Sequence, residues 1–217
     1  NWRDSGSTVR RELGTLMVVD AIALVLRQLN QYIVQADGGS AGAPNPALWG
    51  NISQLDRSEI ATELDNHLVL SLVNLEEERA LKNGKVAVNR DSTEVTYKNP
   101  PIHLNLLLLF TANYRNYETA LKRLTQVLTF FQGKQKFTPN NSPGANPGPP
   151  PIMEFSLVMD LLSLSFEEVN HLWGSLGGKQ SPFVVYRGRL VTIADQRVLE
   201  GGGRIQEIGL TSREVTS

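Results

Sequence analysis

The sequence predicts an α+β domain in which a mostly antiparallel mixed sheet is packed by two main helices. Two long apolar segments, residues 68–79 and 99–114, are rich in β-forming residues and have the character of central strands covered on at least one face. Residues 18–33 and 117–131 carry apolar side chains at helical spacing. The pair Asn83-Gly84 suits a tight hairpin turn, which requires antiparallel arms. The connections are short, so we expect both helices on one side of the sheet.

Composition indicates an ordinary globular domain with one core. The chain has 217 residues, and its 21 basic side chains nearly balance 22 acidic ones. It therefore lacks the positive field by which nucleic-acid binders attract phosphate backbones, and we predict no nucleic-acid partner. The absence of cysteine excludes disulfides, thiolate catalysis and cysteine-ligated metals.

The first helix follows residues 1–15, which we expect to be a poorly ordered N-terminal extension. The apolar run 16–26 is interrupted by Asp20 and is shorter than the roughly 20 residues of a membrane span. Polar residues occupy the other side of this helix: Asp20, Arg27, Asn30 and Gln31. A glycine- and proline-rich connection, 37–46, ends the helix, and residues 47–52 can form a short strand.

The middle of the chain contains a hairpin and the second helix. Residues 58–66 are too polar to assign, while 85–88 form the predicted returning arm after Asn83-Gly84. Asn116 is a suitable N-cap for the helix 117–131, and Gly133 follows where a helix should stop. The proline- and glycine-rich segment 138–151 lacks apolar residues and is predicted to be an extended or mobile loop inserted in the domain.

The last third predicts further strands around one short helix. Residues 152–164 have strand character, and Ser165 with Glu168 forms a capping box that starts the helix. Residues 182–193 alternate as a half-exposed strand does, which favours a position near a sheet edge. Gly201-Gly202-Gly203 is predicted to be a hinge before the strand-like segment 204–210. The domain is therefore predicted to span residues 16–196, with a C-terminal arm, 197–217.

No catalytic, cofactor-binding or metal-binding residues are predicted, so we expect a protein that is not an enzyme. His67, His103 and His171 stand at unrelated spacings and form no metal or triad motif, which favours structural or surface roles. The run Glu76-Glu77-Glu78-Arg79 cannot converge on one ion, because consecutive strand residues point to alternate faces. A strand end that contacts a neighbouring chain is the better interpretation of this run.

Several segments together resemble one known family. They are residues 70–79, Asn99-Pro100-Pro101 before the strand 102–112, Asn116-Tyr117 at a helix start, Phe130-Phe131-Gln132, and residues 162–177. Over residues 16–193 the chain is similar to the cap or tail-terminator family of extracellular contractile injection systems. These are phage-tail-like particles such as antifeeding prophages and Photorhabdus virulence cassettes.

The resemblance implies a tail-terminator-like fold and a structural role. It implies a hexameric ring that ends the inner tube and sheath at the end distal to the baseplate and holds the sheath during contraction. The partners would be the last rings of sheath and tube protein and a second cap paralogue, with assembly in the bacterial cytoplasm. No cofactor, small-molecule substrate or nucleic acid is implied.

Position in the predicted fold selects the candidate interface residues. We expect ring contacts from the helix 117–131 and from the strand end 76–79, and backbone pairing with a neighbouring chain from either the arm 204–210 or the strand 183–191. The residues are Glu76, Glu77, Glu78, Arg79, Arg187, Arg189, Arg204, Ile205, Ile208 and Leu210. Two alternatives stay open: the terminator of a contractile phage tail that joins tail to head, and an α/β enzyme or ligand-binding domain.

Overall fold

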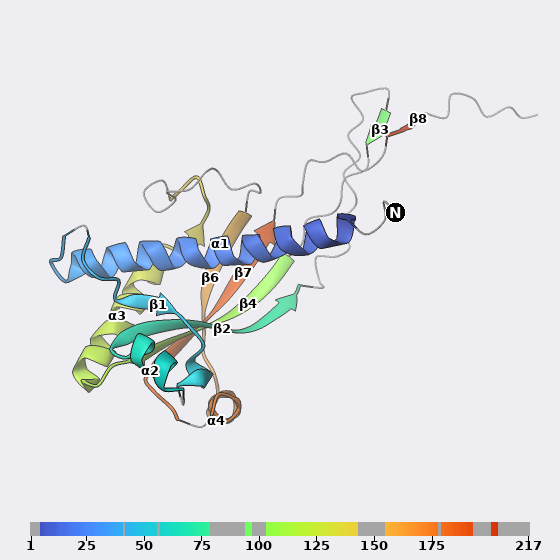
Figure 1. The fold of residues 1–217 in the computed structure, drawn as a ribbon. Helices are drawn as coiled ribbons and strands as arrows, with labels where there is room; N and C mark the ends of the chain where they lie inside the picture. Colours follow the sequence, from blue (N-terminus) through green and yellow to red (C-terminus); the bar gives the residue numbers. More distant parts are fainter. Residues whose placement is uncertain are drawn as a thin grey trace, which may run out of the picture.

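A six-stranded sheet forms the centre of the computed structural model, which describes residues 5–40, 42–55, 57–78, 94–96, 103–142, 155–177, 179–192 and 201–203 (Figure 1). The strand order is β1-β2-β4-β7-β6-β5. The strands are β1 (Ala47–Trp49), β2 (His67–Glu77), β4 (His103–Asn113), β5 (Lys136–Phe137), β6 (Phe155–Leu162) and β7 (Phe183–Thr192). β1 pairs with β2 in parallel, and every other pair in this sheet is antiparallel. The predicted α+β fold with a mostly antiparallel mixed sheet is confirmed.

Two helices, α1 (Ser5–Ala36) and α3 (Tyr117–Gly133), cover one face of this sheet (Figure 1). They contribute to the larger core cluster with alternate residues of β2, β4, β6 and β7. An aromatic group, in which Phe131 contacts Phe110, Phe137 and Tyr186, lies between α3 and the sheet. The prediction that both main helices lie on one side is confirmed.

The first helix is longer than its predicted core of residues 18–33. It begins at Ser5 and ends at Ala36, so the backbone of residues 5–15 is helical. These residues contain no proline, and extending an existing helix by one residue costs far less free energy than starting a new one. None of the described helices is long and apolar enough to cross a membrane.

The opposite face of the sheet is covered only in part. The 3-10 helix η1 (Ile52–Gln54) and the helices α2 (Ser58–Leu64) and α4 (Phe166–Ser175) pack there. They form a second, smaller buried cluster, which consists of Ile52, Leu64, Val69, Leu109, Leu172 and Val185. The segment 58–66, whose polar sequence predicts no definite element, therefore supplies a helix that packs on the sheet through Leu64.

The position of β7 corrects the sequence-based prediction of an edge strand. β7 lies between β4 and β6 and pairs with both. Its alternation arises because one face of the sheet is packed and the other is partly open: Gly188 and Leu190 are buried, whereas Arg187 and Arg189 are exposed. The outermost strands are the short β1 and β5. The prediction that this strand pairs through its backbone with a neighbouring chain is therefore wrong.

A second, two-stranded sheet joins distant parts of the chain. β3 (Glu94–Thr96) pairs antiparallel with β8 (Gly201–Gly203), with Val95 opposite Gly202. The three glycines predicted to be a hinge thus form a strand. The predicted turn at Asn83-Gly84, its returning arm 85–88, most of the loop 138–151 and the segment 204–210 lie outside the described residues.

Candidate interaction surface

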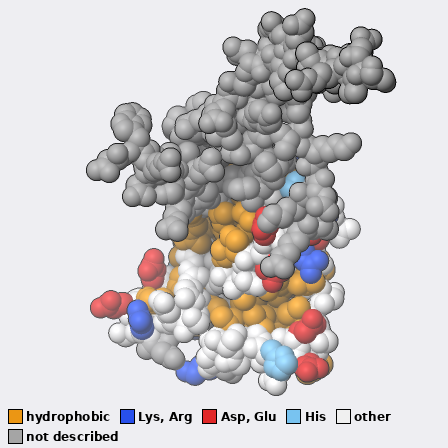
Figure 2. Space-filling model, turned by 90° about the vertical axis from the view of Figure 1, so that its right-hand side faces the viewer, with side chains coloured by type: hydrophobic (Ala, Val, Ile, Leu, Met, Phe, Trp, Pro, Cys, Tyr) orange, Lys and Arg blue, Asp and Glu red, His pale blue; other side chains and the backbone are white. Residues whose placement is uncertain are grey.

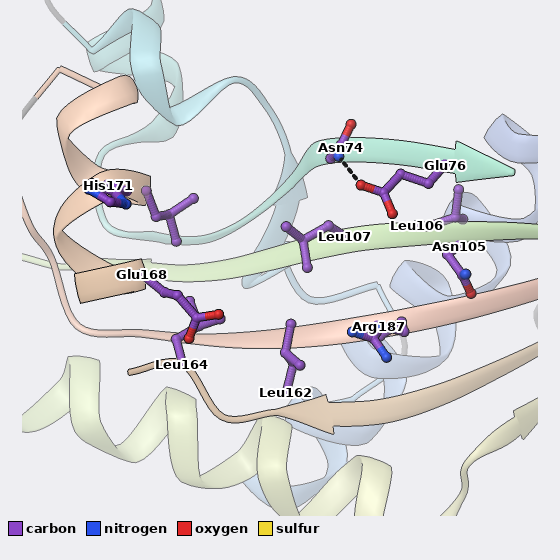
Figure 3. A pocket seen from close by; sticks show the side chains of 11 residues that line it. Asn74, Glu76, Asn105, Leu106, Leu107, Leu162, Leu164, Glu168, His171 and Arg187 are labelled. Atoms are coloured by element: carbon purple, nitrogen blue, oxygen red, sulfur yellow. Dashed lines mark hydrogen bonds between the residues drawn. The ribbon is translucent and has the colours of Figure 1, made fainter. Parts of the chain in front are cut away.

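The uncovered half of the second sheet face forms a groove beside α4. Its volume is about 330 Å³. Leu107 of β4 and Leu162 of β6 project into it, and Leu164 continues this apolar floor (Figure 3). Glu168 and His171 of α4 form one wall, while Asn74, Glu76 and Asn105 lie toward the strand ends (Figure 3). The groove combines an apolar floor with a charged rim.

A β-bulge in β2 sets which side chains reach this groove. The register between β2 and β4 shifts between Leu72 and Asn74, so that Asn74 lies opposite Leu107 and Glu76 opposite Asn105. Opposite residues of an antiparallel pair share a face, and one inserted residue exchanges the two faces beyond it. Asn74 and Glu76 therefore face the groove, and the Asn74 Nδ2 donates a hydrogen bond to Glu76 Oε1 over 2.8 Å.

Charged side chains surround the floor in a mixed pattern. Arg187 is exposed at the groove, and Arg189, two residues along β7, forms an ion pair of 2.8 Å with Asp160 of β6. The Glu168 carboxylate accepts a hydrogen bond from the backbone N–H of Ser165. Hydrogen bonding with the backbone and the side chain of Ser165 lowers the pKa of this carboxyl. Glu168 is thus ionised at neutral pH, so the rim carries both signs of charge.

A smaller hollow of about 170 Å³ continues the groove across the sheet. It shares Asn105 with the groove and is also lined by Glu78, His103, Val158 and Arg189. The Asn105 Nδ2 donates to Glu78 Oε2 over 2.9 Å, and the backbone N–H of Glu78 donates to the carbonyl of His103. On the side of the molecule seen in Figure 2, hydrophobic side chains gather between acidic and basic ones.

Local sequence positions α4 as the wall of the groove. Ser165 and Glu168 form the predicted capping box, in which Ser165 Oγ accepts from the backbone N–H of Glu168 over 3.2 Å. Leu172 and Trp173 are buried beneath the helix, and the Trp173 ring meets Phe183 edge-on. The capping box fixes where the helix begins, and the two anchors fix which side faces the groove.

Half of the predicted interface residues lie in the described part of the chain. Glu76 and Arg187 line the groove, and Glu78 and Arg189 line the adjoining hollow. Glu77 lies opposite Leu104 and so faces the helix-covered side, as expected for alternating strand residues. The others lie outside the described residues: Arg79, Arg204, Ile205, Ile208 and Leu210.

Several groove residues were not among the candidates. Asn74 and Asn105 interrupt otherwise apolar strands, and this was the sequence signal that could have identified a solvated sheet face. His171 was predicted to have a structural or surface role, and it lies exposed on the wall formed by α4. No described residues gather three or more metal-ligating side chains.

An apolar stripe is exposed on the outer surface of α3, on the other side of the sheet. Tyr117, Leu121 and Leu128 are 66%, 45% and 38% exposed. Leu161 of β6, 55% exposed, lines the same hollow as Leu128 and extends the stripe across the sheet. We call Tyr117, Leu121, Leu128 and Leu161 the α3 ridge.

An ion cluster beside the ridge joins the end of α1 to α3. Asp37 forms ion pairs with Lys122, over 2.8 Å, and with Arg123, and it accepts a hydrogen bond from Gln126. Burial opposes ionisation of Asp37, but the bonds from these three side chains outweigh it and lower its pKa to about 2. The cluster holds α3 at a defined position along α1.

Comparison with known proteins gives one matching family model and, among the solved structures, the two similarities described below. A family model described as the Pvc16 N-terminal domain matches residues 20–207. A PVC sheath/tube terminator of an extracellular contractile injection system, in its extended state, is 12% identical with a TM-score of 0.49, over 87% of this chain and 63% of that chain. The tube-terminating cap of the anti-feeding prophage is 14% identical with a TM-score of 0.47, over 67% and 49%.

This chain therefore spans less than two thirds of the length of either solved structure. No curated protein matches the sequence significantly.

Proposed function

This chain belongs to the Pvc16 N-terminal domain family, and from that membership we propose that it is a terminator of the tube and sheath of a contractile injection system. The family match over residues 20–207 is the observation that carries the proposal, because it includes all strands of the central sheet. The resemblance of segments 70–79 and 162–177 to cap proteins supports the same role. The charged groove and the α3 ridge suit a protein that works through contacts with other subunits.

The physical task of a terminator is to match a growing polymer on one side only. Tubes and sheaths grow because each ring offers the next ring a heterologous surface. A ring stops this growth when one of its sides matches the last sheath and tube subunits and its other side matches no further subunit. In this proposal the chain forms a hexamer at the end distal to the baseplate, assembles in the bacterial cytoplasm, and meets the last rings of sheath and tube protein and a second cap paralogue.

The fastening to the sheath is proposed to use the C-terminal arm. With β7 in the middle of the sheet, the segment 204–210 is the remaining candidate for backbone pairing with a neighbouring subunit. Such pairing would spread the load of contraction over many hydrogen bonds. The candidates in this arm are Arg204, Ile205, Ile208 and Leu210.

The test removes the protein, and then only its arm, from cells that assemble the particles. Without the protein, tubes and sheaths should lose their uniform length in negative-stain micrographs. Deletion of residues 204–217, which leaves β8 intact, should keep the particle length and reduce the sheath retained after contraction. Particles of normal length without the protein, together with its absence from purified particles, would refute the terminator role.

A charge exchange tests the proposed strand-end contact. Glu77→Arg with Arg79→Glu reverses two charges where β2 ends, and light scattering should show fewer rings. An unchanged mass distribution would remove this strand end from the ring contact.

A further inference from the structure

We propose that neighbouring copies of this chain join head to tail, with the α3 ridge of one copy seated in the groove beside α4 of the next. This inference rests on the proposed ring, and it names the two surfaces that build it. Its occupant is a second copy of the chain.

The ridge has the pattern of a helix prepared for a partner. Tyr117, Leu121 and Leu128 follow one side of α3, with the small exposed Thr125 between the last two. Four of the nine large hydrophobic side chains exposed in the described residues belong to the ridge. Apolar side chains gathered along one exposed side of a helix are the anchors by which an amphipathic helix enters a groove.

The groove offers an apolar floor with polar edges. Its floor of Leu107, Leu162 and Leu164 lies between α4 and the ends of β2 and β4, and α4 bounds it on one side. An apolar floor with a polar rim is the usual host for an amphipathic helix.

The two surfaces lie on opposite faces of the sheet. α3 packs on the face of the larger core cluster, while α4 packs on the face of the smaller one. Copies joined through two different surfaces on opposite faces continue in one direction and close into a ring when the rotation allows it. A two-fold dimer would instead require one surface to match itself, and two α3 ridges would leave both grooves empty.

Charge complementarity favours the same pairing. The ridge carries Glu118 and Lys122 on its flanks, and the groove carries Arg187 on one side and Glu168 on the other. Arg187 has no ion pair with any described residue, so a carboxylate from a second copy can satisfy it. We assign Glu118 of one copy to Arg187 of the next.

Thiol crosslinking tests the contact in the full chain and in isolated particles. The chain has no cysteine, so only introduced thiols react. We use Thr125→Cys in the ridge, His171→Cys in the groove wall, and Glu59→Cys on α2 as a matched exposed control. A short bismaleimide should link a mixture of the Thr125 and His171 variants into dimers, but neither variant with itself and not the mixture of the Thr125 and Glu59 variants.

Each other outcome contradicts the inference in a distinct way. Rings without a link between the two variants overturn the ridge-in-groove contact and leave the terminator role intact. Self-linking of the Thr125 variant shows a two-fold contact, and a link from His171→Cys to sheath or tube protein assigns the groove to that partner. A chain that stays single at high concentration and is missing from the particle end overturns both proposals.

A charge exchange provides the second measurement. Glu118→Arg and Arg187→Glu should each weaken self-association about tenfold, and the double variant should regain most of this loss. Both residues are exposed, so each variant should stay folded, and Glu118→Arg should lower the melting temperature only slightly, because Glu118 lies in the first turn of α3, where a carboxylate is favoured. A double variant whose self-association is weakened by the sum of the two single effects would contradict the assigned pair.

Discussion

Asn30 shows how one side chain can act as part of a sheet. The sequence pattern placed it on the polar side of the first helix, but it is only 6% exposed. Its Nδ2 donates to the carbonyl of Ala47 and its Oδ1 accepts from the N–H of Ala47, both over 2.8 Å. The amide therefore pairs with β1 as a neighbouring strand would, and a helical pattern cannot reveal such a partner 17 residues away.

Replacing Asn30 should show how much those two hydrogen bonds contribute to the free energy of unfolding. Asn30→Leu leaves the buried N–H and C=O of Ala47 without partners and should lower the free energy of unfolding by about 3 kcal/mol. Arg27→Leu, on the exposed side of the same helix, should change it by less than about 0.5 kcal/mol. Urea denaturation measures both, and equal effects would show that the pairing with Ala47 contributes little.

Asp37 makes stability depend on pH in a predictable direction. Its pKa falls from an ordinary value of 3.8 to about 2 in the folded chain. A lowered folded-state pKa contributes stability that is fully present above the unfolded value and is lost as pH falls through the folded value. Asp37→Asn should therefore lower the unfolding free energy at pH 7 by about 1 kcal/mol, because the partly exposed pairs are screened by solvent.

The difference between Asp37→Asn and the parent should shrink between pH 4 and pH 2, as thermal melts across that range would show. Asp20→Asn, which removes an exposed carboxyl of α1, is the matched control. A pH-independent difference would mean that Asp37 acts through packing.

At the scale of elements, β7 shows that alternation of apolar and polar residues can have two causes. Alternation of apolar and polar residues marks a strand with one open face, and it does not distinguish an edge from an interior strand whose neighbours leave one face bare. Arg187 and Arg189 belong to the second case. Gly188 between them faces the larger core, where the strands β4 and β6 leave little room.

Gly188 tests the packing of that interior position. A Cβ there would lie 3.0 Å from Leu157 Cδ1 and 3.4 Å from both Leu108 Cδ1 and Met159 Sδ. Gly188→Val should overpack the core and lower the unfolding free energy by about 2 kcal/mol. Arg187→Val, the neighbour on the open face, should leave it nearly unchanged, and a comparable loss in both variants would contradict the assigned faces.

At the scale of the whole molecule, one sheet supports two separate cores. β2, β4 and β7 contribute to both clusters, with Leu68, Leu108 and Leu190 on one face and Val69, Leu109 and Val185 on the other. Loss of either layer uncovers the shared strands, so the two cores should unfold together.

A single-tryptophan variant can measure this cooperativity. Trp2→Phe with Trp49→Phe leaves Trp173, which is buried beneath α4, as the only reporter of that side. Its fluorescence transition in urea should coincide with the far-ultraviolet dichroism of the whole chain. An earlier fluorescence transition would show that α4 and its cluster unfold independently.

The sequence by itself determined the two main helices, the long strands of the central sheet and the start of α4, and the family to which the chain belongs. The stripe of α3, its Asn116 cap and the capping box of α4 depend on residues within a few positions of each other, and such local patterns are visible without a structure. It also indicated that both main helices lie on one face of the sheet and that the side chains of Glu76 and Glu77 point to opposite faces.

Only the tertiary structure decided the strand order, the short edge strands and the uncovered half-face that becomes the groove. These features depend on pairings between segments far apart in the chain, such as β2 with β4 and β4 with β7, and on where α4 stops covering the sheet. Distant pairings are chosen by the packing of the complete core, so they leave no periodic signal in any one segment.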